Sequence, residues 1–313
     1  PNWVWLKARS ATEGHAIFDT VRGVQKRIGS NGADAENDQS SYLTAFGTEG
    51  FTVGSSGLVN SNSTTYVSWN WKAGTSFTND ASSTGIGTID STGSASDTAG
   101  FSIVSYTGTG SAGTIKHGLS TAPSTIYVKR RSGSSESWTS FHKPLGNDGR
   151  LIFNTSDGAG SSSSYWNSTA PTSSVFSIGD NDGTNTSGET YIAYCISDVK
   201  GYSKSGLYTG NANNNGPVIW CGFEPAFVIW KKKTGEAWGM TDNKRDPHNP
   251  NKGHLYPNHN NAEGTGNVLM DFLSTGFKVR WSDGNINHSD GIIFMAFAKS
   301  PFVSSSGVPT TAR

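Results

Sequence analysis

Aromatic and cationic side chains alternate along three short segments of the chain, each of which begins at a proline. The alternating face of these segments reads, in chain order, Trp3-Trp5-Lys7-Arg9, Thr125-Tyr127-Lys129-Arg131 and Phe227-Ile229-Lys231-Lys233. An aromatic ring beside a cation can stack on a sugar and pair with an acidic glycan. This chemistry makes Trp5, Tyr127, Lys129 and Lys231 candidate binding residues. The alternative, which we favour, is that the face packs on a neighbouring copy or subunit while the lysines reach outward.

Two further tryptophans stand at matching places after the second and third segments. Trp138 and Trp238 each follow a short turn that contains Gly, Ser or Glu. An exposed indole at this point is a platform for a ligand, so both residues join the candidate binding set. The competing interpretation is a core or interface position, which is the more common place for a lone tryptophan on a short strand.

A loop rich in oxygen ligands, residues 179–188, is the candidate metal site. Its side-chain oxygens include those of Asp180, Asp182 and Asn185. Calcium needs six to eight oxygens held close together. The spacing does not match an EF-hand loop, and the matching loop at residues 54–65 has no acid. We therefore favour a solvated turn and expect no bound metal.

Sequence patterns for catalysis are missing from the chain. It contains no Gly-x-Ser-x-Gly elbow, no phosphate-cradling Gly-x-x-x-x-Gly-Lys loop and no Cys paired with a His motif. His248, His254, His259 and His288 lack the spacing of a zinc site, so surface loops are the better interpretation. We expect neither an enzyme nor a cofactor. A glycosidase whose carboxylates meet only in space stays open as an alternative.

The three proline segments belong to an internal repeat, which must position these side chains. The repeat is ungapped over three stretches, Pro1–Arg9, Pro123–Arg131 and Pro225–Lys233. Two motifs of the first copy return at identical spacing in the third, Asp19-x-x-Arg22 as Asp242-x-x-Arg245 and Asn31…Glu36 as Asn258…Glu263. The candidate side chains therefore stand on a repeated scaffold.

Dense turn residues and period-two alternation predict an all-β chain of tandem β-sandwich-like repeats, with about seven short strands in each copy. Gly is frequent at 39 residues, and ten Trp can fill a thin core between two sheets. We divide the chain into an incomplete first copy, a linker or extended arm, a second copy, a third copy and a C-terminal tail, at residues 1–74, 75–98, 99–199, 200–303 and 304–313. Because the first copy begins inside the repeat, we expect its opening strands to lie upstream of Pro1.

Charge and hydropathy argue against two classes of partner. The formal net charge is zero and charged residues make up 15% of the chain, whereas nucleic-acid binding needs a positive field. No apolar run approaches the ~20 residues of a membrane helix. We expect no nucleic acid and no membrane insertion. Cys195 and Cys221 lie in apolar runs and are interpreted as buried thiols, with their pairing left open.

Longer motifs run through the chain: Phe18-Asp-Thr-Val-Arg-Gly23, Glu49-Gly-Phe-Thr-Val-Gly54, Trp69-Asn-Trp-Lys-Ala-Gly74, Ala99-Gly-Phe-Ser-Ile-Val-Ser-Tyr-Thr-Gly108 and the closing stretch 301–313. Together they resemble a recurrent family of repeat domains of unknown function in virion and tail-fibre proteins of marine tailed bacteriophages. The resemblance covers almost the whole chain and implies a phage structural or tail-fibre-type protein, with no established catalytic residues. A weaker similarity, at the level of the fold alone, is to trimeric tail-fibre lectin-like sandwiches.

The function expected from these features is that of a virion structural protein, a tail-fibre or surface adhesion component that contacts the host envelope. The expected partners are further copies of the chain, other virion proteins and a host surface glycan. Assembly in the host cytoplasm would need no signal peptide. The alternatives are a secreted, extracellular carbohydrate-binding or adhesive filament protein and a capsid decoration protein.

Overall fold

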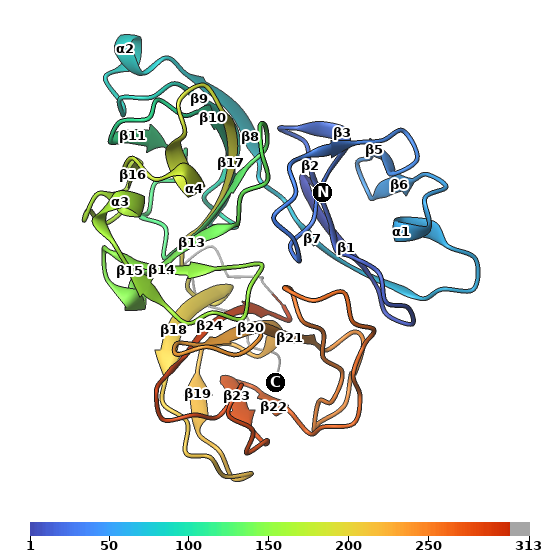
Figure 1. Ribbon diagram of the computed structural model, residues 1–313. Helices are drawn as coiled ribbons and strands as arrows, with labels where there is room; N and C mark the ends of the chain where they lie inside the picture. The colour runs from blue at the N-terminus through green and yellow to red at the C-terminus, as the bar shows by residue number, and fades with distance from the viewer. Residues whose placement is uncertain (301–313) are drawn as a thin grey trace. The chain divides into compact units, whose positions relative to one another are not determined.

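The computed structural model describes residues 1–300, and the chain folds as two compact units (Figure 1). Unit 1 comprises Pro1–Asn154 and Gly160–Ser197, and unit 2 comprises Thr155–Ala159 and the chain from Asp198 onward. Unit 1 therefore contains the first copy, the expected linker and most of the second copy, whereas unit 2 contains the third copy. The expected tail at 304–313 and the last three residues assigned to the third copy lie outside the described residues.

The prediction of an all-β chain is confirmed, since the elements of residues 1–300 are strands apart from a few single turns of helix. The strands of the named sheets pair antiparallel. Helices within residues 1–300 are single turns: α1 Gly57–Asn60, α2 Ala81–Thr84, α3 Ser163–Trp166, α4 Asp182–Asn185 and the 3-10 turn η1 Lys143–Leu145. None of the helices in this part of the chain has the length and apolar character needed to cross a membrane. The sheets differ in size, and the uniform unit of about seven strands stays a proposal.

The first copy forms a five-stranded sheet in unit 1. Its strand order is β4-β3-β2-β1-β7, with bounds Asn37–Asp38, Gly23–Ile28, Ala16–Asp19, Trp3–Ala8 and Tyr66–Trp71. A separate ladder joins β5 Leu43–Phe46 to β6 Phe51–Val53. Because side chains alternate along a strand, Val4 and Leu6 share the face of β1 that packs against Phe18 and Leu43. The opposite face of β1 is buried as well.

The second copy forms the larger sheet of unit 1. Its order is β15-β14-β13-β12-β17-β10-β9-β8, with bounds Gly160–Ser161, Gly149–Ile152, Thr139–His142, Thr125–Arg130, Thr190–Ile196, Phe101–Thr107, Ser91–Ser96 and Thr75–Asn79. A two-stranded ladder of β11 Gly113–Lys116 and β16 Val175–Ile178 completes the copy. Ile126 and Val128 of β12 share a core with Ile115 and Phe176 of this ladder.

The segment 75–98, expected as a linker or an extended arm, is instead an ordered part of the second copy. It forms β8, α2 and β9, and β9 pairs with β10 over six residues. The sequence hid this because the strands are almost all Ser, Thr and Gly, and Phe77 is their one large apolar side chain. Gly93 and Gly118 leave room for its ring, since a Cβ there would lie 2.7 and 2.6 Å from ring carbons of Phe77. Backbone pairing, the ring of Phe77 and the buried side chain of Ile89 therefore hold a segment that has little hydrophobic pattern.

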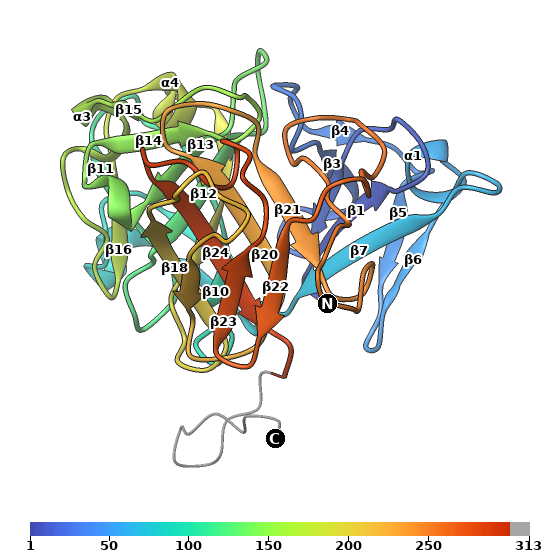
Figure 2. The ribbon, with the colours of Figure 1, turned by 90° about the horizontal axis from the view of Figure 1, so that it is seen from below.

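Unit 2 is built from a four-stranded and a three-stranded sheet. The first has the order β18-β24-β20-β21, with bounds Ser203–Tyr208, Ile292–Ala298, Pro225–Lys232 and Gly239–Asp242. The second has the order β19-β23-β22, with bounds Val218–Trp220, Gly276–Val279 and Met270–Leu273. Figure 2 shows β24 between β18 and β20.

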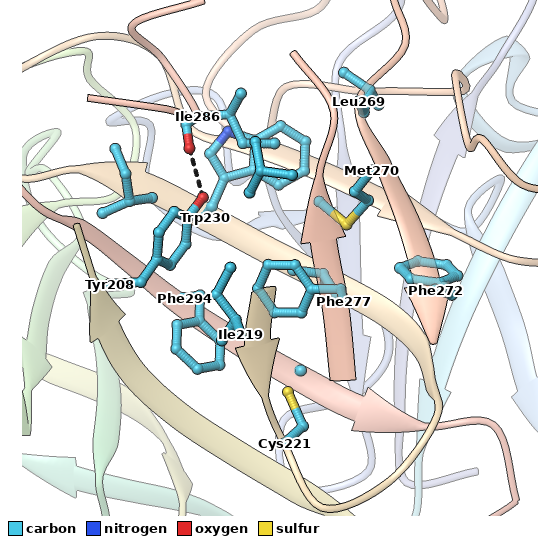
Figure 3. Close-up of a cluster of buried hydrophobic side chains, with 14 of the residues drawn as sticks. Tyr208, Ile219, Cys221, Trp230, Leu269, Met270, Phe272, Phe277, Ile286 and Phe294 are labelled. Atoms are coloured by element: carbon cyan, nitrogen blue, oxygen red, sulfur yellow. Dashed lines mark hydrogen bonds between the residues drawn. The ribbon is translucent and has the colours of Figure 1, made fainter. Parts of the chain in front are cut away.

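The two sheets of unit 2 share one core (Figure 3). Trp230 and Phe294 come from the four-stranded sheet, and Ile219 and Phe277 come from the three-stranded sheet. Tyr208 closes one end of this core, where its hydroxyl donates a 2.6 Å hydrogen bond to the carbonyl oxygen of Ile286. This is the sandwich arrangement that a few large aromatic rings can fill.

Both cysteines are free and buried, as interpreted from the sequence. Cys195 lies in the core of unit 1 and Cys221 in the core of unit 2. Burial away from water disfavours the thiolate and raises the pKa of each thiol to about 12. Neither side chain is therefore an activated nucleophile.

Candidate functional site

The six side chains singled out as candidate ligand-binding residues are all buried. Their exposed fractions lie between 0% and 6%, in the set Trp5, Tyr127, Trp138, Trp238, Lys129 and Lys231. Side chains this deeply buried do not present a platform to a sugar. The binding interpretation is corrected, and the physical reason is that other parts of the chain cover the segments that carry these residues.

In unit 1 the covering surface comes from the neighbouring copy. The ring of Trp3 lies 5.4 Å from that of Tyr194, and the ring of Trp5 lies 6.0 Å from that of Phe153. In the other direction, the indole nitrogen of Trp138 donates a 2.8 Å hydrogen bond to the carbonyl oxygen of Gly29. The alternating face is therefore an interface between copies, which is the alternative that we favoured.

The favoured alternative also expected the repeated lysines to reach outward, and this part is wrong, because their ammonium groups are bound inside the protein. Lys129 Nζ donates to the carbonyl oxygens of Ala33, Arg130 and Glu136 at 2.9, 3.0 and 2.7 Å. Lys7 is held by the carbonyl oxygens of Ala8 and Ala11, and Lys231 by those of Ser156 and Glu236. Each ammonium group thus bridges backbone carbonyl oxygens of neighbouring segments inside the protein. Ala33 belongs to the first copy, so Lys129 also ties two copies.

Burial of these ammonium groups predicts how stability depends on pH. Desolvation lowers the pKa of Lys7, Lys129 and Lys231 from 10.5 to about 8. Between these values the unfolded chain still holds protons that the folded chain has released, so the free energy of unfolding rises with pH. Above pH 10.0 the trend reverses, because burial raises the pKa of Tyr106, Tyr194 and Tyr208 well above that value.

Urea titrations across about pH 7 to 11 measure this curve. We expect the free energy of unfolding to be largest near pH 10, where the rise caused by the lysines gives way to the fall caused by the tyrosines. The variant Lys129→Met has no titrating group at that position, so its free energy of unfolding should rise less steeply with pH. A steady fall in stability from neutral pH upward would contradict the account.

A buried ionic network explains why the Asp-x-x-Arg spacing recurs. Arg22 Nε lies 2.5 Å from Asp19 Oδ2, and Arg22 Nη1 lies 3.2 Å from Glu36 Oε2. Arg131 of the second copy pairs with the same glutamate at 3.0 Å, and Tyr194 donates a 2.8 Å hydrogen bond to Asp19. Burial alone would lower the pKa of Arg22, but its anionic neighbours outweigh this and raise it.

Unit 2 contains the corresponding ionic cluster. Arg245 lies 2.6 Å from Asp242 and 2.7 Å from Glu263. The two matching motifs therefore encode the same packing device rather than a catalytic group.

The candidate calcium loop is a structural cap. Asn185 Oδ1 accepts from the backbone N–H groups of Thr109 and Gly110, and its amide nitrogen donates to the carbonyl oxygens of Ser111 and Gly179 at 2.7 Å. An amide oxygen that faces N–H donors is not available to a cation. Asn287 makes the corresponding bonds in unit 2. The metal interpretation of Asp180, Asp182 and Asn185 is corrected in favour of a hydrogen-bonded turn.

The histidines are less exposed than we expected. His254 is buried, with its ring 5.1 Å from that of Tyr256, and its pKa is lowered by burial. His248 is exposed, as a surface loop predicts. Within residues 1–300, His, Cys, Asp and Glu form no group of three that could hold a metal ion.

The exposed large apolar side chains of the described chain all lie in unit 2. They are Leu207 of β18 and Val218 and Trp220 of β19, exposed by 43%, 60% and 65%. Lys204 of β18 reaches across to β19, where its ammonium lies 4.5 Å from the centre of the Trp220 ring and donates to the Trp220 carbonyl oxygen at 3.0 Å. We call Lys204, Val218 and Trp220, together with Lys278 opposite Val218, the open edge.

The matching edge of unit 1 is covered by the chain itself. Phe277 pairs with Ile219 in unit 2 as Phe176 pairs with Ile115 in unit 1, so Trp220 corresponds to Lys116. There the segment 75–98 covers the edge. Ile89 bridges to Ile115, and the ammonium of Lys116 lies 5.6 Å from the ring of Phe77. Unit 2 has no counterpart of this segment between β17 and β18, so Trp220 stays in solvent.

A polar hollow of about 280 Å³ lies on unit 1, where β8, β9 and β10 meet. Hydroxyl side chains line it together with Asp80 and Asp90. Asp80 caps α2 by accepting from the N–H of Ser83, and Asp90 accepts from the N–H of Ala81. Because both carboxylates already hold α2, we favour the open edge as the candidate binding surface.

Sequence reasoning missed Trp220, because the residue lies in the apolar run around Cys221 and residue type alone does not separate exposed from buried side chains there. The signal that could have found it is the alignment of copies. The strand has Thr114-Ile-Lys116 in the second copy and Val218-Ile-Trp220 in the third, so only the central residue keeps its apolar character. An indole that replaces a lysine indicates a surface position with a changed role.

Comparison with known proteins gives a family and no characterised relative. A family model described as a domain of unknown function, DUF7483, matches residues 1–301. Neither the curated proteins nor the solved structures include a significant match to the chain.

Proposed function

We propose that this chain, which belongs to the DUF7483 family of domains of unknown function, is a structural protein of a bacteriophage virion. In this proposal it is a tail-fibre or surface adhesion component that contacts the host envelope. The motif resemblance described above supports the phage origin. The observation that carries the adhesion role is the contrast between a repeated, buried scaffold and an open edge that differs from its counterpart in unit 1.

The scaffold suits a structural role because buried hydrogen bonds and ion pairs join the first copy to the second. Lys129 and Arg131 of the second copy reach Ala33 and Glu36 of the first. In tandem repeats of about seven strands, such contacts bury surface between neighbours without a large single core. Loops and edges that are not shared are then free to vary, which is where recognition belongs in such a protein.

Assembly follows from the same proposal. The chain is made in the host cytoplasm, associates with further copies and with other virion proteins, and is displayed on the virion. Its host-side partner is a surface glycan.

Labelling of intact virions tests the proposal. We expect antibodies against the purified chain to bind virions at the tail or fibre in electron micrographs, and to block adsorption to host cells. Labelling spread evenly over the capsid would replace the fibre role with capsid decoration. An absence of the chain from purified virions, combined with its export by bacterial cells, would overturn the phage role in favour of a secreted adhesive protein.

A further inference from the structure

We infer that the open edge of unit 2 binds acidic sugars, an inference that rests on the proposed host contact and names its chemistry. The ligand class is an oligosaccharide whose rings carry carboxylates. An exposed indole, two ammonium groups and the failure of this edge to accept a further strand support it.

The indole of Trp220 is positioned to stack on a sugar ring. Ile219 points into the core (Figure 3). Because side chains alternate along a strand, Val218 and Trp220 point to the outside, where they are exposed by 60% and 65%. Gly276 pairs with Trp220 on the neighbouring strand and has no side chain to cover the ring. A Cβ at Gly276 would collide with the carbonyl oxygen of Ile219, so the backbone itself keeps this place bare.

Two ammonium groups flank the apolar surface. The ammonium of Lys204 lies over the Trp220 ring, and Lys278 is the cross-strand partner of Val218. Within the described residues both ammonium groups are bound by neutral oxygens, those of the Trp220 carbonyl and the Asn215 side chain, and neither takes part in an ion pair. A carboxylate on the ligand would be their first anionic partner.

The residues of the open edge include two cations and no acid, although the chain as a whole is neutral. Arg280, two residues after Lys278, forms an ion pair with Asp271 at 2.5 Å. Asp198 lies near β18, where it accepts a hydrogen bond from the N–H of Ser205. Trp220 and Val218 are about 7 Å apart, since each strand residue rises about 3.4 Å. In a chain of acidic sugars, one ring would stack on Trp220 and the carboxylate of a neighbouring sugar would reach Lys278, which lies beside Val218.

A protein strand fits the same edge poorly, because much of the outer backbone of β18 is already bonded. Ser203 exchanges both of its backbone hydrogen bonds with Val199, and the N–H of Ser205 donates to Asp198 Oδ1 at 2.8 Å. In unit 1 the corresponding strand, β10, pairs with β9 over six residues. Edge strands that bond to a side chain in this way resist the addition of another strand.

Titration calorimetry of the purified chain tests the inference. The probe is an oligogalacturonate, and its fully methyl-esterified form is the neutral match with the same rings. We expect binding of the charged form and at least about tenfold weaker binding of the ester. Trp220→Ala should weaken binding of the charged form by about tenfold or more, and Lys204→Gln with Lys278→Gln should remove the preference for it.

Two control variants separate the open edge from general effects. Lys116→Ala changes the position that corresponds to Trp220 in unit 1, and Lys72→Gln removes an exposed charge elsewhere. Both should bind like the unaltered chain. Circular dichroism should show that every variant is folded.

Failure of this inference can be told apart from failure of the proposed function. Equal binding of the two oligosaccharides, or unchanged binding by Trp220→Ala, would overturn the acidic-sugar site. A Trp220→Ala variant that changes the mass of the oligomer and not sugar binding would make the edge a protein contact. Virion labelling and host adsorption are measured independently, so they decide the virion role whatever the calorimetry shows.

Discussion

Arg22→Ala is expected to destabilise unit 1 by about 3–5 kcal/mol, the usual cost of removing one partner from a buried ionic network. The guanidinium is fully buried between Asp19 and Glu36 and also donates to the carbonyl oxygen of Ile17 at 3.0 Å. Alanine leaves the carboxylate of Asp19 in the interior without its cation. Glu36 keeps Arg131, so the loss falls mainly on Asp19.

Urea unfolding followed by tryptophan fluorescence measures this loss. The matched control is Arg280→Ala, which removes an Arg–Asp pair of the same 2.5 Å length whose arginine side chain is 42% exposed. An exposed pair contributes about 0–1 kcal/mol, so the control should unfold almost like the unaltered chain. Similar losses in the two variants would show that burial does not set the value of the pair.

Trp138→Ala is expected to cost about 3–5 kcal/mol, as for other large aromatic side chains removed from a core. The ring lies 6.0 Å from Phe153 and 6.1 Å from Tyr194, and its nitrogen bonds to the carbonyl oxygen of Gly29. The substitution therefore leaves a cavity and an unsatisfied carbonyl at the contact between two copies. Trp138→Phe, which keeps an apolar ring, should lose less.

This variant also separates a structural tryptophan from a binding one. Host-cell binding by Trp138→Ala should fall only in proportion to the unfolded fraction, whereas Trp220→Ala should lose binding while its stability changes by no more than about 0.5 kcal/mol. Urea midpoints and cell-binding assays on the same preparations compare the two. Loss of binding by fully folded Trp138→Ala would restore the earlier interpretation of Trp138 as a ligand platform.

Local pattern was enough to predict the class of fold and the positions of many strands. Period-two alternation marks β12 and β17, and the repeated proline segments mark β1, β12 and β20. The Asp-x-x-Arg spacing also carried information, since both arginines do pair with the aspartate three residues before them. These features depend on residues close together in the chain.

Strands β8 and β9 were beyond the reach of local pattern. β9 pairs with β10 and β8 pairs with β9, and one phenylalanine ring packs with them; neither feature leaves an apolar periodicity in the sequence. The calcium interpretation failed for a related reason. The sequence shows that the loop has many side-chain oxygens. It does not show that Asn185 Oδ1 accepts a hydrogen bond from the N–H of Thr109, a residue more than seventy positions away.

Residue type and spacing along the chain were enough to predict an all-β protein with three matching strands after prolines, each with an aromatic or apolar side chain and a lysine on the same face. Long-range packing makes this face an interior, because both faces of β1 are covered by residues distant in the chain. It also decided where a ligand can reach the protein. The segment 75–98 covers one edge in unit 1, and the matching edge of unit 2 lacks that cover, so Trp220 is exposed while Trp5 and Trp138 are not. Exposure is a property of what packs against a residue, and that depends on contacts which local residue type and spacing do not record.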